Sequence, residues 1–193
     1  WAMPTKRLAA TAILLAGLDR NDGFVTAGLR AFSIAQDYGA LAALLTARLE
    51  IDGPAGLSQV EADWVMAPGL SRTASGGALL AMRVHAEAKP ELWRGPVTAA
   101  YGSIAIRKPD LAGFVAGHLE LLGAWDAVPA LGAALVDGVL PEDAELPVLS
   151  FLRAAPVPAA AEAEAAFLAR QRLSASQGSS GPLGRGPIDG KAF

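Results

Sequence analysis

Residues 109–139 carry apolar side chains at helical spacing, in two stripes separated by a glycine. The first stripe is made of Leu111, Phe114, Val115, His118, Leu119 and Leu122. Each of these residues has another member of the stripe three or four positions away, so all of them lie on one face of a helix. Pro109 suits the first turn of this helix, because its missing N–H would have no partner there anyway. Gly123 is placed to end the helix with a positive φ.

A second stripe predicts another helix directly after Gly123, and it consists of Val128, Leu131, Leu135 and Val139. Asp126 can cap this helix, and Pro129 lies within its first turn, where proline is tolerated. Two helices joined by so short a break form an antiparallel hairpin.

The same periodicity predicts helices along most of the chain, at residues 5–18, 24–36, 38–51, 58–67, 77–89, 96–108, 141–153 and 158–173. No segment alternates as a strand would. We therefore expect an all-α fold of stacked antiparallel helical hairpins, either a right-handed solenoid or a compact irregular bundle.

Local signals place the boundaries between these helices. Asp37 can cap the third helix. Ser58 and Glu61 have the spacing of a capping box, which predicts a helix start at Ser58. Residues 70–77 read as a polar loop, and Pro90 ends the helix that follows it.

Four glycines fall inside predicted helices, at Gly28, Gly113, Gly117 and Gly132. Each costs roughly 1 kcal/mol relative to alanine in a helix interior. A close approach of a neighbouring helix would compensate this cost, so we expect tight helix contacts at these positions.

The last part of the chain has a different composition. Residues 174–193 are rich in glycine, serine and proline and have little to bury, which is typical of an extended tail without a fixed fold. The sequence thus predicts a helical domain at residues 1–173 and a C-terminal tail at residues 174–193.

Composition excludes several classes of function. The chain has 193 residues, a net charge of −3 and no cysteine. A slightly acidic chain argues against a nucleic-acid-binding surface, which is normally basic. The absence of cysteine excludes disulfides, thiol catalysis, zinc–thiolate sites and iron–sulfur clusters.

Amino-acid usage and the N-terminal segment bear on the origin of the chain. The Ala, Gly, Leu and Arg usage suggests a GC-rich bacterial genome, with cytoplasm and periplasm both open as the compartment. No apolar run has membrane-spanning length. Residues 6–18 resemble a signal sequence, but a buried first helix is favoured. Because the first residue is Trp1 and not Met, we expect a processed product or part of a longer protein.

Two hairpins show internal similarity. Residues 38–44 align with residues 125–131, which matches Tyr38 to Trp125 and places alanines and leucines at equivalent positions. The passage around Gly123 and Trp125 resembles the turn of the tetratricopeptide (TPR) family of helical repeats. This resemblance implies a right-handed superhelix with a concave face that binds a peptide or protein.

Candidate chemistry is sparse. His118 could act in catalysis or bind a metal, but a histidine on an apolar helix face is more often a packed, hydrogen-bonded side chain. His85 and Glu87 are two positions apart, so they do not face each other on a helix. We therefore predict no metal, no cofactor and no catalytic residue, and expect a non-enzymatic protein.

Large aromatic residues near helix ends are the better candidates for a function, because they act either as packing wedges or as interface anchors. The candidates for partner binding are Tyr38, Trp64, Trp93, Trp125 and Phe193. The favoured function is a scaffold module that binds a protein or peptide. The alternatives are a structural subunit of a bacterial envelope or virion assembly fastened by its tail, and an all-α enzyme with a site near His118.

Overall fold

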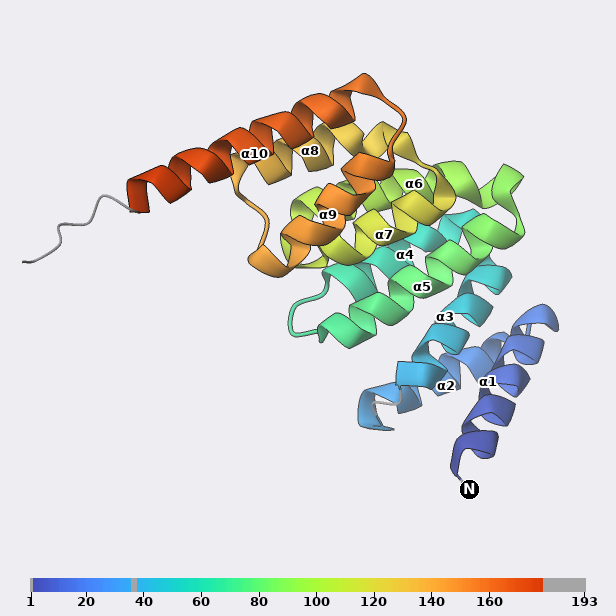
Figure 1. Cartoon of the computed structure of the whole chain (residues 1–193). Helices are drawn as coiled ribbons and strands as arrows, with labels where there is room; N and C mark the ends of the chain where they lie inside the picture. Colours follow the sequence, from blue (N-terminus) through green and yellow to red (C-terminus); the bar gives the residue numbers. More distant parts are fainter. Residues whose placement is uncertain (1, 36–37, 179–193) are drawn as a thin grey trace, which may run out of the picture.

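The computed structural model describes residues 2–35 and 38–178, and these residues form helices and short connections without any strand (Figure 1). The all-α prediction is confirmed. The helices are α1 (Ala2–Leu18), α2 (Asp22–Ala35), α3 (Tyr38–Asp52), α4 (Leu57–Glu61), α5 (Arg72–Ala88), α6 (Pro90–Arg107), α7 (Ala112–Leu122), α8 (Val128–Asp137), α9 (Glu142–Ala154) and α10 (Pro158–Gly178). Short 3₁₀ turns η1 (Gly53–Gly56), η3 (Pro109–Leu111) and η4 (Trp125–Ala127) and a π-helical turn η2 (Ala62–Met66) connect some of them.

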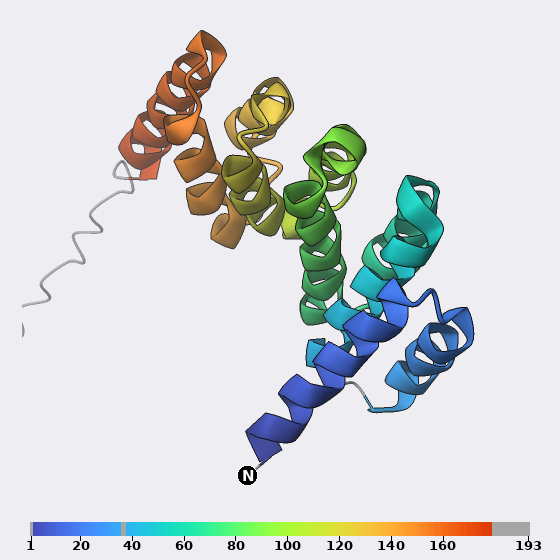
Figure 2. The same ribbon diagram turned by 90° about the vertical axis from the view of Figure 1, so that its right-hand side faces the viewer.

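The helices are arranged in two layers. The odd-numbered helices pack on one another in order, α1 on α3, α3 on α5, α5 on α7 and α7 on α9. In the other layer α6 packs on α8 and α8 on α10. Figure 2 shows that the stack is curved, with the odd-numbered helices on the inner side of the arc and the even-numbered helices on the outer side.

The core runs through the stack between the two layers. One apolar cluster extends from Leu41 in α3 to Phe167 in α10. A second, smaller cluster joins α1, α2 and α3 and consists of Ile13, Val25, Ala43, Leu44 and Ala47. Neighbouring hairpins therefore supply one another's apolar partners, because a single hairpin cannot bury its own apolar face.

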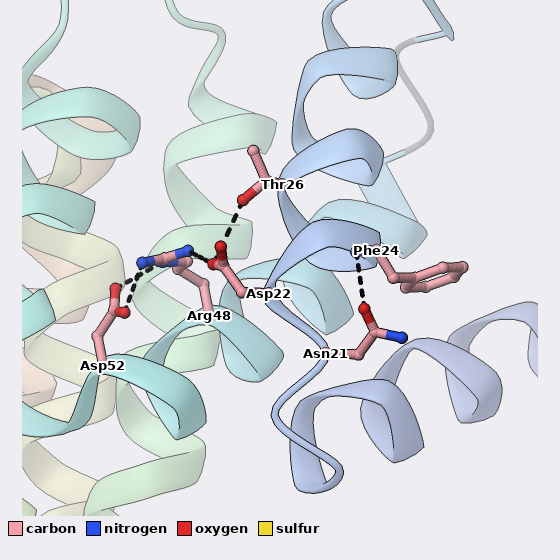
Figure 3. Close-up of polar contacts among 6 residues, drawn as sticks. All are labelled: Asn21, Asp22, Phe24, Thr26, Arg48 and Asp52. Atoms are coloured by element: carbon pink, nitrogen blue, oxygen red, sulfur yellow. Dashed lines mark hydrogen bonds and ion pairs between the residues drawn. The ribbon is translucent and has the colours of Figure 1, made fainter.

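Helix ends follow the turn chemistry of the sequence in several places. Gly123 ends α7 with φ 57°, as predicted, and its N–H donates to the carbonyl oxygen of Glu120 at 2.9 Å. Gly138 ends α8 in the same left-handed conformation. At the start of α2, the Asn21 side-chain oxygen accepts the N–H of Phe24 at 3.1 Å (Figure 3).

Two predicted boundaries are wrong because local composition was misleading. The predicted loop at residues 70–77 is mostly helical, since α5 begins at Arg72 and the Ser71 hydroxyl accepts the N–H of Ala74 at 3.2 Å. Helix α6 begins at Pro90 and continues through Pro96, which the sequence placed at its start. Packing of the rest of this helix offsets the loss of the hydrogen bond that an internal proline removes.

The predicted caps at Ser58 and Asp126 are not formed either. Helix α4 follows η1 without a break, so Ser58 lies inside the helix and Glu61 instead pairs with Arg107 on α6 at 2.9 Å. Asp126 lies within η4, and the residue before α8 makes no side-chain cap. The predicted cap at Asp37 falls outside the described residues.

Three of the four internal glycines lie at close helix contacts. A methyl carbon added at Gly28 would lie 2.5 Å from Leu44 Cδ2, and one at Gly113 would lie 3.3 Å from Pro147 Cγ. At Gly132 it would lie 2.8 Å from the Cβ of Ala163 on α10. Gly117 has no neighbour within 4 Å, so the expectation of a tight contact is wrong there.

The aligned hairpins of the sequence are not structurally equivalent. Tyr38 begins α3, which lies in the inner layer with α1 and α5, whereas Trp125 precedes α8, which lies in the outer layer with α6 and α10. An aromatic residue followed by alanines and leucines fits the turn before either kind of helix. The similarity therefore reflects hairpin chemistry and not a repeated structural unit.

The C-terminal boundary also differs from the sequence expectation. Helix α10 continues through residues 174–178, which were predicted to belong to the extended tail. Residues 179–193 lie outside the described part of the chain.

Candidate functional site

Large apolar side chains are exposed on the inner side of the arc. The odd-numbered helices have the outer layer behind them and their neighbours beside them, so their remaining exposed side chains face inward. Apart from Leu14, Leu15 and Leu18 on α1, the large apolar side chains exposed on these helices are Leu80 and Val84 on α5, Phe114 and Leu121 on α7, and Leu146 on α9. Their exposed fractions range from 37% at Leu80 to 75% at Leu146. We call these five residues the inner ridge.

Small residues beside the inner ridge let its side chains stand above the helix surface. A methyl carbon at Gly76 on α5 would lie 3.9 Å from the ring of Phe114 on α7, so the two helices lie next to each other at this point. Gly113 packs against Pro147 on α9. Gly117 lies between Phe114 and Leu121 with nothing above it. Small residues therefore separate the large apolar side chains of the inner ridge.

His118 lies next to the inner ridge and is tied to the outer layer by a chain of hydrogen bonds. The hydroxyl of Tyr101, a buried residue of α6, donates to the carbonyl oxygen of Leu79 at 2.5 Å. With its proton used in this way, the Tyr101 oxygen accepts from His118 Nδ1 at 3.2 Å. The arrangement favours the tautomer with the proton on Nδ1, which leaves Nε2 as an acceptor.

Burial keeps the side chains of His118 and Tyr101 uncharged at neutral pH. Burial, with a smaller contribution from the charge of Arg83, lowers the pKa of His118 to about 4. Burial also raises the pKa of the Tyr101 hydroxyl. Nε2 of His118 has no hydrogen-bond partner among the described residues and is not buried. His118 thus offers one neutral acceptor beside the ridge and otherwise links α6 to α7.

Both basic side chains in the N-terminal and middle parts of α5 form ion pairs within the chain. Arg72 pairs with Asp143, and Arg83 pairs with Glu87 at 3.3 Å. Glu120 on α7 has no ion pair among the described residues.

Trp93 is not a surface residue. It is 1% exposed, and its ring stacks on His85 with a centroid distance of 4.5 Å. His85 Nε2 lies 2.9 Å from the carbonyl oxygen of Thr46, so this pair wedges α3, α5 and α6 together. The sequence hypothesis that Trp93 contacts a partner is corrected to a role in packing.

The other aromatic candidates are scattered and do not form one site. Trp64 is half-buried and lines a pocket between α2 and α4. Trp125 is half-buried in η4, and its ring lies 5.4 Å from that of Phe151 on α9. Tyr38 is the first residue of α3, but its side chain and the whole of Phe193 lie outside the described part of the chain.

The inner ridge was not recognised in the sequence. Phe114 was assigned to the buried stripe of α7, yet it is 48% exposed. On α5, Leu79 and Leu80 are adjacent, and only Leu79 points into the core. The available signal was the four-residue spacing from Leu80 to Val84 and the seven-residue spacing from Phe114 to Leu121, which mark second apolar faces on helices that already have one.

Comparisons with protein-family models, curated proteins and solved structures found no match for this chain. The class of protein is therefore defined by its fold alone, and this fold is a curved two-layer stack of helical hairpins. Within residues 2–35 and 38–178, no helix combines the length and apolar character needed to cross a bilayer. The same residues contain no group of three His, Cys, Asp or Glu side chains that could hold a metal ion.

Proposed function

We propose that this chain is a non-catalytic interaction module that binds a protein or peptide on the inner ridge. The observation that carries the proposal is the exposure of Leu80, Val84, Phe114 and Leu121 on two neighbouring helices of the concave side. Contiguous exposed apolar patches on soluble proteins are typically interaction sites. Burying one such side chain fully contributes about 1.5–3 kcal/mol, so a few of them can anchor a partner.

The scaffold suits this role because the ridge is built on packed helices. The glycine contacts at Gly113 and Gly132 and the core between the layers fix the helices in place, so little order has to be gained on binding. The turn around Gly123 and Trp125 resembles that of the TPR family, and members of that family bind partners on their concave face.

The other two hypotheses have less support. The assembly hypothesis depends on a fastening tail, and residues 179–193 lie outside the described part of the chain. The enzyme hypothesis depends on His118 as a catalytic residue. The hydrogen-bond partner of His118 is Tyr101, and burial keeps both groups neutral near pH 7. This arrangement favours a structural link over a proton-transfer pair.

The proposal can be tested with peptides selected by phage display against the wild-type protein. Phe114→Asp and Leu121→Asp place a charge in the ridge, and we expect each to weaken selected peptides by at least tenfold. The controls are Leu92→Asp and Leu173→Asp on the outer layer, whose side chains are 52% and 64% exposed, against 48% and 66% for the ridge positions. Equal losses at ridge and control positions, or retention of binding by both ridge variants, would contradict the proposal.

A further inference from the structure

Helix α10 ends at the edge of the inner layer where α9 begins. Arg153 on α9 pairs with Glu164 on α10 at 2.7 Å, and Glu145 pairs with Arg170 at 3.1 Å, so the two helices run antiparallel. Helix α10 continues beyond Arg170 to Gly178, which adds about 12 Å of helix. The described part of α10 therefore extends past the start of α9, as Figure 1 shows.

The inner ridge starts at this same edge. Leu146 follows Glu145 directly on α9 and is 75% exposed. Gly113 packs against Pro147 and directly precedes Phe114, which is the first ridge residue of α7. Leu146 and Phe114 therefore come from neighbouring turns of α9 and α7, near the end of α10.

The chain that follows α10 is long enough to cross the ridge. Residues 179–193 contain three large apolar residues at five-residue intervals, Leu183, Ile188 and Phe193. A chain of this length can span up to about 50 Å. Packed helices are about 8–10 Å apart, so the ridge from α9 across α7 to α5 is only about 20 Å wide.

The charges at this edge are complementary to those of the segment. Neither Glu142 in the first turn of α9 nor the side chain of Asp110 in η3 forms an ion pair among the described residues. Arg72 lies at the same edge, but it is bonded to Asp143 and to the carbonyl oxygen of Asp110. The segment has two basic side chains and one acidic side chain, Arg185, Lys191 and Asp189.

We propose that residues 179–193 bind in cis along the inner ridge of their own chain, with Leu183, Ile188 and Phe193 on its exposed apolar side chains. The basic residues of the segment then lie over the acidic edge formed by Glu142 and Asp110. The segment competes with an external partner for the same surface, so this inference rests on the proposed function. Because the segment is tethered, its effective concentration at the ridge is about millimolar, and weak docking is sufficient.

The expected competition is moderate in size. A segment with a Kd of about 0.1–1 mM, at an effective concentration of about 1 mM, occupies the ridge in about 50–90% of the molecules. Only the remaining molecules can bind a partner, so the apparent affinity for the partner is lowered by about two- to tenfold.

A spin label on the segment detects docking without any external partner. The chain has no cysteine, so Gly186→Cys provides a single attachment point for a nitroxide. We expect the label to broaden the amide NMR signals around Phe114 and Leu146, and the broadening should not change on dilution. Phe114→Asp and Leu146→Asp should each reduce the broadening, whereas the control Leu92→Asp on the outer layer should not.

A variant with a polar segment separates docking from simple tethering. Leu183→Ser/Ile188→Ser/Phe193→Ser keeps the length and the charges, so the broadening that remains in it comes from tethering alone. The same variant without a label should bind the peptides selected for the ridge about two- to tenfold more tightly than the unmodified chain. Leu173→Ser on α10 is the control, because Leu173 is 64% exposed and lies outside the segment, and it should leave the affinity unchanged.

The outcomes separate this inference from the proposed function. Equal broadening in the unmodified and the polar segment overturns docking, even where the selected peptides bind the ridge. Broadening that disappears on dilution assigns the segment to a second copy and overturns docking in cis. An unchanged peptide affinity in the polar variant overturns the competition. If the polar variant loses the broadening but no peptide binds the ridge, docking stands and the proposed function fails. A circular dichroism melt of each variant checks its folding first.

Discussion

The contact between α8 and α10 at Gly132 predicts an unusual result for a glycine-to-alanine substitution. On helix propensity alone, Gly132→Ala should stabilise the protein by about 1 kcal/mol. The new methyl carbon would lie 2.8 Å from the Cβ of Ala163, whereas carbon atoms prefer separations of about 3.5–4.0 Å. Both atoms are attached directly to the backbone, so the two helices have to separate by roughly 1 Å.

Overpacking of this kind costs about 1–3 kcal/mol. Subtracting the propensity gain leaves a net loss of about 0–2 kcal/mol for Gly132→Ala. Gly117→Ala is the matched control, because Gly117 is also inside a helix and has no neighbour within 4 Å. That variant should gain up to about 1 kcal/mol, so the two variants should differ by about 1–3 kcal/mol.

Urea unfolding followed by circular dichroism at 222 nm measures both free energies. A thermal melt should agree, with about 2–4 °C per kcal/mol for a chain of this length. Ala163→Gly supplies a second check, because it removes the opposing methyl group. In that background Gly132→Ala should become stabilising. If Gly132→Ala stabilises the unmodified protein as much as Gly117→Ala does, the contact argument is refuted.

Two further predictions concern the buried polar and aromatic groups. His118 has a lower pKa in the folded chain, about 4, than the ordinary 6.5, so the unfolded chain takes up its proton first as the pH falls. The free energy of unfolding should therefore decrease from about pH 6.5 towards pH 4, less so in His118→Gln, and an NMR titration should show the His118 ring still neutral at pH 5. Trp93→Ala should lose about 3–5 kcal/mol in urea unfolding and Trp93→Phe clearly less, because the indole is buried against His85. A loss below 1 kcal/mol for Trp93→Ala would contradict its role as a wedge.

Periodicity in the sequence was sufficient to predict the helical class and the end of α7 at Gly123. Those features depend on local backbone preferences, which a short window of sequence contains. The start of α5 was missed because serine, threonine and glycine are typical of loops. Their small size here serves packing instead, since Ala74 and Ser75 are buried and Gly77 lies next to α3.

The candidate sites were harder to predict because they depend on which layer a helix occupies. Leu80 and Phe114 look like core residues in the sequence, and only the inner position of α5 and α7 exposes them. Trp93 and Trp64 have similar surroundings in the sequence, yet one is a wedge in the core and the other lines a pocket. Layer assignment is a long-range property that helix patterns do not encode.

The division of the core into two clusters has a consequence for local unfolding. The small cluster around Val25 and Ala47 holds α1 and α2 with few large side chains, so these helices can open while the larger cluster stays closed. In hydrogen exchange, amides of α2 should report a subglobal opening with a lower free energy than amides of α6 or α7. One wall of the α2–α4 pocket belongs to this less stable unit. A ligand that binds only the closed pocket would slow hydrogen exchange in α2 as its occupancy rises. Binding would therefore stabilise the N-terminal end of the stack.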